Sequence, residues 1–193
     1  MTRGDISATL RAASIRGLIV LAMVAACSGS EREVKEAEVE RARTALLPFK
    51  NELKSTFLKG LEEGPVEAIA VCREAAPEIA LHHSTSGIEM GRTSHRLRNP
   101  GNGPADWMNP LLESYVKGSR EPYRAVVLDD RRVGYVEPIY IQKPCLMCHG
   151  ETVAPVIAGQ IEQLYPGDLA VGFEEGDFRG LFWVTIPLED EEQ

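Results

Sequence analysis

The sequence predicts an α+β fold, with helices in its first half and an antiparallel sheet in its second half. In residues 31–118, apolar side chains recur three or four positions apart among good helix formers. In residues 122–187, runs rich in β-branched and aromatic residues alternate with turn residues. The sequence has no internal repeat, and its 193 residues suit a single domain behind a leader.

The first 26 residues have the pattern of an export signal. Arginines precede the apolar run 17–26, which is too short to span a bilayer but has the length of a signal core. The run ends in a Val-Ala-Ala-Cys sequence that resembles the lipobox of bacterial lipoproteins, so we expect acylation of Cys27. Ser28 follows and favours the outer membrane by that resemblance. The expected product is a periplasmic, lipid-anchored domain over residues 27–193; the alternative is ordinary cleavage that leaves Cys27 lost or idle.

The charge of the mature chain limits its partners. The full sequence carries −8, and residues 1–26 hold three Arg and one Asp, so their removal takes away +2 and leaves −10. A strongly negative protein is repelled by phosphate backbones and anionic lipids. We therefore expect no nucleic-acid partner, and contact with the membrane only through the lipid anchor.

Two amphipathic helices are expected first. The pattern over residues 31–60 predicts a long helix, which Pro48 should kink or divide because proline removes one backbone hydrogen bond and clashes with the preceding turn. Glycines 60 and 64 mark its end. The second helix, over residues 65–81, places Cys72 on its core-facing side.

The remaining elements are expected to be short. The predicted elements are a strand within 88–103, a helix at 104–116, a hairpin of strands at 125–128 and 133–141, a helix within 152–164, and strands at 169–173 and 180–187.

A cysteine and histidine motif follows the predicted hairpin directly, and the chemistry of the chain is centred on it. It reads Cys145-Leu146-Met147-Cys148-His149. In this spacing each thiol can add to one vinyl group of haem, and the adjacent imidazole can bind the iron. The alternatives are a redox-active Cys-x-x-Cys pair and part of a zinc site. No second Cys-x-x-Cys-His occurs, so we expect one covalently bound haem c.

Counting the four cysteines leaves one without a covalent role. With Cys27 used for lipid and two cysteines for haem, Cys72 remains. It is either a small buried apolar residue or the second axial ligand of the iron. Arg92 or Arg98 could pair with a haem propionate, the alternative being surface charge. The other candidates for the sixth iron position are Met90, Met108, His82, His83 and His95.

Several short motifs, in order, resemble the c-type-haem PAS-like domain family, often found as the sensor end of histidine kinases. The resemblance covers residues 40–187 and rests on Ala70-Val71-Cys72, Arg92-Thr93-Ser94, Arg98-Asn99-Pro100-Gly101-Asn102 with Trp107, the cysteine and histidine motif, Tyr165 to Gly172, and Gly176-Asp177-Phe178-Arg179-Gly180. It implies a PAS-like antiparallel sheet flanked by helices, with a long N-terminal helix. It also implies that His149 and Cys72 are the axial ligands.

These expectations define three classes of function. The first is a haem redox or ligand sensor; since no kinase or cyclase domain follows Pro187, its output would come from a signalling partner. The second is a membrane-tethered single-electron carrier with a redox partner. The third is a haem peroxidase, a small reductase or a four-helix cytochrome, which we do not expect: a ligating Cys72 leaves no open catalytic site, and Gly150 and Pro155 break helix after the motif.

The expected chemistry is reversible one-electron redox at a low potential, because a thiolate ligand favours ferric over ferrous iron. Cys72 is then expected to protonate or leave in the ferrous state. Its departure would open a position for a small gas ligand.

Overall fold

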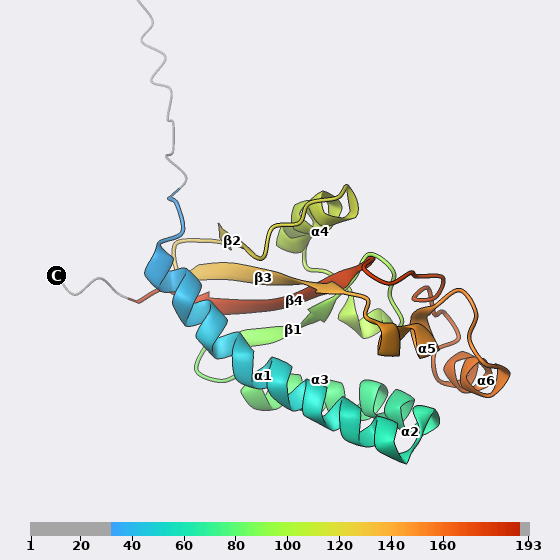
Figure 1. Cartoon of the computed structure of the whole chain (residues 1–193). Coiled ribbons are helices and arrows are strands. Elements are labelled where there is room, and N and C mark those ends of the chain that lie inside the picture. The colour runs from blue at the N-terminus through green and yellow to red at the C-terminus, as the bar shows by residue number, and fades with distance from the viewer. Residues whose placement is uncertain (1–31, 190–193) are drawn as a thin grey trace, which may run out of the picture. The chain divides into compact units, whose positions relative to one another are not determined.

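A four-stranded antiparallel sheet forms the centre of the fold, with strand order β1-β4-β3-β2. In the computed structural model, which describes residues 32–189, the strands are β1 (Glu89–Thr93), β2 (Arg124–Val127), β3 (Arg132–Tyr140) and β4 (Phe178–Pro187) (Figure 1). The long central strands pair from Arg132↔Pro187 to Tyr140↔Phe178. The predicted α+β class is therefore confirmed. The expected signal peptide and Cys27 lie outside the described residues.

The long N-terminal helix α1 (Glu36–Glu63) covers one face of the sheet. Leu46 and Phe49 of this helix are buried against alternate residues of the central strands, such as Val133 and Val184. Pro48 lies inside the helix and does not divide it, contrary to one of the expected outcomes. The helix continues because the apolar residues around Pro48 are held by the sheet, which outweighs the loss of one backbone hydrogen bond.

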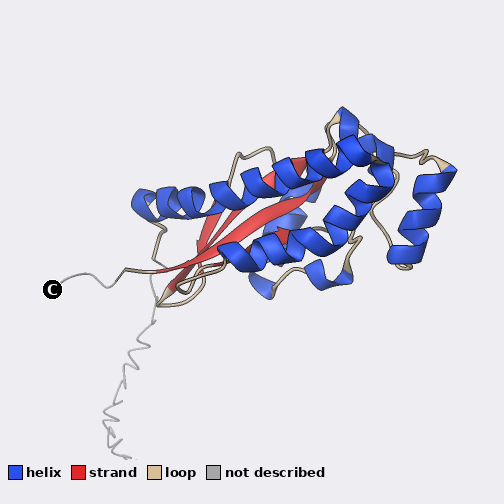
Figure 2. Cartoon of the chain, turned by 90° about the horizontal axis from the view of Figure 1, so that it is seen from below, coloured by secondary structure: helices blue, strands red, loops and turns tan. Residues whose placement is uncertain are grey.

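The second helical segment is interrupted by a π-helical turn that the sequence does not predict. It comprises α2 (Pro65–Ala70), the π turn Val71–Ala75, and α3 (Ala76–His83). Figure 2 shows this segment beside α1, and residues of α1 and α3 share the core against the sheet. The π turn includes Cys72, and turns of this kind occur often at functional sites.

The opposite face of the sheet is covered by α4 (Asn109–Val116) and the 3₁₀ turn before it, Asp106–Met108. Leu111, Leu112 and Tyr115 form a second core there with strand residues. The indole of Trp107 lies on Gly134, where an added Cβ would come within 2.8 Å of the ring.

The C-terminal part of the chain contains two short helices, α5 (Leu146–His149) and α6 (Pro155–Leu164). One prediction for this region is wrong. Residues 169–173 do not form a strand; their one ladder contact is the bridge Gly150↔Phe173. Carbonyls of this segment instead accept hydrogen bonds from arginine and histidine side chains, so they are not available for pairing with a strand. Within residues 32–189, no helix combines the length and apolar character needed to cross a membrane.

Candidate cofactor site

One cavity of about 270 Å³ brings the predicted site residues together. Cys72 lines it from the π turn, and Cys145, Cys148 and His149 line it from the motif around α5. Arg92 and Arg98 also line it. The rest of the wall is mainly apolar, with side chains from α1, α2 and the sheet: Leu53, Phe57, Leu61, Ile69, Leu97, Ile139, Ile141 and Phe182. Residues far apart in the sequence thus surround one apolar space.

His149 is held as a neutral imidazole with one nitrogen committed. Its Nδ1–H donates to the Ala170 carbonyl at 2.6 Å. Burial, followed by the positive charges of Arg98 and Arg179, lowers the pKa of His149 to about 3. Nε2 is therefore the unprotonated nitrogen, and an imidazole whose other nitrogen donates to a carbonyl is the usual form of a metal-binding histidine.

The backbone of the motif is fixed to the loop that contains Ala170. Phe173 N–H donates to the His149 carbonyl and Gly172 N–H donates to the Gly150 carbonyl, both at 2.9 Å. Gly150 is required by close approach, because an added Cβ would lie 2.7 Å from the Leu146 carbonyl oxygen. The histidine is consequently positioned through its ring and through its main chain.

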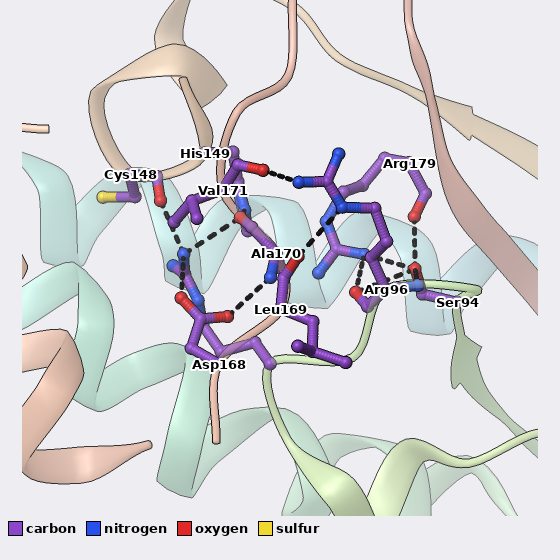
Figure 3. A network of polar contacts seen from close by, with 10 residues as sticks. Ser94, Arg96, Cys148, His149, Asp168, Leu169, Ala170, Val171 and Arg179 are labelled. Carbon is purple, nitrogen blue, oxygen red and sulfur yellow. Dashed lines mark hydrogen bonds and ion pairs between the residues drawn. The ribbon is translucent and has the colours of Figure 1, made fainter. Parts of the chain in front are cut away.

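Arg98 holds the same loop from the other side. Its Nη2 donates to the carbonyls of Cys148, at 2.5 Å, and of Ala170, at 3.2 Å. It also forms an ion pair with Asp168 at 3.0 Å. Figure 3 shows Asp168, Ala170, Cys148 and His149 within this polar network. Arg98 is therefore largely engaged within the protein, whereas the Arg92 side chain makes no hydrogen bond or ion pair with residues 32–189.

Two further arginines belong to the network, and sequence reasoning assigned them no role. Arg96 Nε donates to the Leu169 carbonyl at 2.9 Å, and its guanidinium lies 4.2 Å from the Phe173 ring centroid. Arg179 Nη1 donates to Ser94 Oγ at 2.6 Å (Figure 3). Burial and the neighbouring arginines lower the pKa of Arg179 to about 10. The sequence feature that could have identified Arg179 is its position as a charged residue within the mainly apolar strand β4.

The Cys72 side of the cavity is packed rather than hydrogen-bonded. Ile69, one turn before Cys72, is buried with Ile161 and Tyr165 in a cluster that Cys148 also contacts. Burial, and next the nearby Cys72, raises the pKa of Tyr165 to about 12. The two cysteine-bearing segments therefore share one apolar cluster.

The other candidates for the sixth iron position do not line the cavity. Met90 and Met108 are buried. His83 lies 2.7 Å from the Glu52 carboxylate, and its neighbour His82 is exposed. His95 is exposed and stacks on Phe178, with ring centroids 5.5 Å apart. Among these candidates and Cys72, the cavity contains only Cys72.

The zinc interpretation of the motif receives no support from the described residues. Within residues 32–189, no three His, Cys, Asp or Glu side chains are grouped so that they could hold a metal ion, as a zinc site requires. A larger hollow of about 620 Å³ lies beside Trp107 and Trp183, but no cysteine or histidine lines it.

Fold and site together define a PAS-like α+β domain with a Cys-x-x-Cys-His motif at an internal cavity. The sequence matches the model of the Tll0287-like family over residues 11–187, and the chain belongs to that family. This confirms the family resemblance predicted from the sequence. A solved structure, "Crystal structure of the cyanobacterial heme-protein Tll0287", matches with a TM-score of 0.58 and 22% identity, covering 82% of this chain and 100% of that chain. No curated protein sequence matches.

Proposed function

We propose that this protein is an exported monohaem c-type cytochrome that acts as a haem redox or ligand sensor through a partner protein. The observation that carries the proposal is that Cys145, Cys148 and His149 line the same mainly apolar cavity as Cys72. Family membership and the structural similarity to a heme-protein support it. The periplasmic location and the lipid on Cys27 are part of the proposal and rest on the sequence alone.

The residues around the cavity fit a covalent haem. Cys145 and Cys148 would form the two thioethers, and His149 and Cys72 would be the axial ligands. Two buried polar atoms of cavity residues, Arg98 Nε and Tyr140 Oη, have no hydrogen-bond partner in residues 32–189. Such orphaned donors suit an anionic group, as haem propionates are.

Arg92 is the residue that we expect to hold a propionate. Of the cavity cations, Lys50 pairs with Glu137, and Arg98 and Arg179 have partners in the loops. Lys54 is exposed. Arg92 is half-buried and has no hydrogen bond or ion pair within residues 32–189. Its planar guanidinium can donate two parallel hydrogen bonds to a carboxylate.

Bound haem would supply reversible one-electron redox chemistry, and the π turn favours its use in sensing. Cys72 accepts no hydrogen bond from residues 32–189 that would hold it in place. A π turn accommodates one extra residue in the helix. A shift of the π turn to a neighbouring position in the helix would rotate Cys72 away from the cavity. Because α3 follows the turn and contacts β1, the movement would reach the edge of the sheet.

The alternative function, a membrane-tethered single-electron carrier, is favoured by one observation. Met147, between the two motif cysteines, is 41% exposed. A haem attached there would have an edge near the surface, as electron transfer to a partner requires. The two functions differ in whether Cys72 leaves the iron on reduction.

Absorption spectra of the purified exported protein, oxidised and reduced, together with a pyridine haemochrome assay, test the shared part of the proposal. We expect one covalent haem c with thiolate ligation in the oxidised form; a colourless protein from a host competent in cytochrome maturation would refute it. Carbon monoxide binding to the ferrous wild type and to Cys72→Ala separates the alternatives. A sensor binds it in both proteins, whereas a carrier that retains Cys72 binds it only in the variant.

A further inference from the structure

We propose that Asp168 and Arg98 form a positioning pair that fixes the orientation of His149 and balances the positive charge beside it, and thereby sets the reduction potential of the haem iron. The inference rests on the proposed function, since it concerns the iron that His149 would bind. It assigns to Arg98 a role in addition to the propionate contact expected from the sequence.

The pair acts on His149 through one residue, Ala170. Asp168 Oδ1 accepts a hydrogen bond from the Ala170 N–H at 2.8 Å, which holds the residue whose carbonyl binds His149. That carbonyl accepts the His149 Nδ1–H at 2.6 Å (Figure 3) and a second hydrogen bond from Arg98 at 3.2 Å. Arg98 also binds the carbonyl of Cys148, the residue before His149. The pair therefore holds in place the residue whose carbonyl accepts the His149 Nδ1–H and leaves Nε2 unprotonated.

The pair is buried and balances the charge of the site. The side chains of Arg98 and Asp168 are only 10% and 8% exposed. Among residues 32–189, the cavity wall carries five cations, Lys50, Lys54, Arg92, Arg98 and Arg179, and no carboxylate. Glu137 pairs with Lys50, and Asp168 pairs with Arg98 from just outside the wall. Buried charges are screened weakly, so loss of Asp168 would leave an excess of positive charge that favours the added electron.

The test measures the reduction potential of purified haem-loaded protein. Asp168→Asn removes the charge but keeps an oxygen that can accept the Ala170 N–H. We expect its redox equilibrium to shift about tenfold toward the ferrous form, which for one electron is a rise of about 59 mV. The matched control is Asp177→Asn, because Asp177 also accepts a loop N–H, from Glu174 at 2.8 Å, but is exposed. Its shift should be less than a third as large.

A second variant separates charge balance from simple damage to the loop. Arg98→Met combined with Asp168→Asn removes both charges, and its potential should return close to that of the wild type. The proposal is overturned if Asp168→Asn shifts no more than Asp177→Asn, or if the double variant shifts as far as Asp168→Asn.

Two further outcomes of the same experiment also test the proposal. If Asp168→Asn does not accumulate with haem but the double variant does, at the wild-type potential, the uncompensated Arg98 charge was the defect and the proposal stands. If both fail, the pair serves folding and the tuning role is wrong. Failure of the proposed function is a different result, because it leaves the wild type itself without covalent haem.

Discussion

The two proposed axial ligands of the cavity are held in opposite ways. His149 is fixed by hydrogen bonds that its ring and its main chain form with residues 170–173, in a loop whose carbonyls Arg96 and Arg98 bind. Cys72 lies in a π turn, and its surroundings are apolar contacts without a hydrogen bond to its sulfur from residues 32–189. One side is therefore constrained by directional bonds, and the other by packing alone.

This difference predicts which of the two proposed ligands can leave the iron. Directional bonds keep an imidazole within a few tenths of an ångström of one position, whereas a π turn can change the rotation of its side chains with little loss of backbone bonding. We therefore expect the His149 side to act as the permanent attachment and the Cys72 side as the part that responds to reduction. The following predictions test that division, starting with the largest effect.

The permanent side depends on the two motif cysteines. In Cys145→Ser combined with Cys148→Ser, covalent haem should be lost completely, because a hydroxyl does not form the thioether. Denaturing electrophoresis with haem staining measures this. Cys72→Ser is the matched control: it also replaces a thiol lining the cavity but should keep full staining. Loss of stain in the control as well would mean that the two sides are not distinct.

Cys72, on the side that responds to reduction, should have the largest effect on the reduction potential of the iron. Cys72→Met replaces an anionic ligand by a neutral thioether, which stabilises ferrous iron. We expect the reduction potential to rise by roughly 0.2 V, within the range of about 0.8 V that axial ligands span. A spectroelectrochemical titration measures the change. A rise no larger than that of Asp168→Asn would show that Cys72 does not bind the ferric iron.

The sequence predicted most of the fold because the hydrophobic periods of α1 and of the hairpin are long and unbroken. It failed at residues 169–173, where an apolar alternation is typical of a strand but long-range hydrogen bonds from Arg96, Arg98 and His149 determine the conformation. The π turn was missed for a similar reason, since helical spacing does not show where one extra residue is accommodated. At the site, local spacing identified the motif, but only the fold distinguishes Arg98, which is paired, from Arg92, which has no ion pair within residues 32–189.

The fixed histidine should make stability depend on pH. In the folded protein burial lowers the pKa of His149 from its ordinary value of 6.5 to about 3. The unfolded chain thus binds the proton first, and stability falls as the pH drops from 6.5 toward 3 by up to about 1.4 kcal/mol per pH unit from this group. Urea unfolding of the haem-free Cys145→Ser, Cys148→Ser protein measures the slope. With His149→Gln added, the slope should decrease; an unchanged slope would place the sensitivity elsewhere.

The smallest effect concerns Arg92, which belongs to neither side and should contact only the haem periphery. Arg92→Leu removes a positive charge near the iron, which disfavours the added electron, so the potential should fall. We expect a shift of about threefold in the redox equilibrium, or about 30 mV, while covalent attachment and axial ligation are retained. Arg73→Leu, an exposed change in the π turn itself, is the charge-matched control and should shift the potential less. If Arg73→Leu has the larger effect, the potential depends on the conformation of the Cys72 turn more than on charge at the cavity wall. The responsive side would then control the site even without a change of ligand.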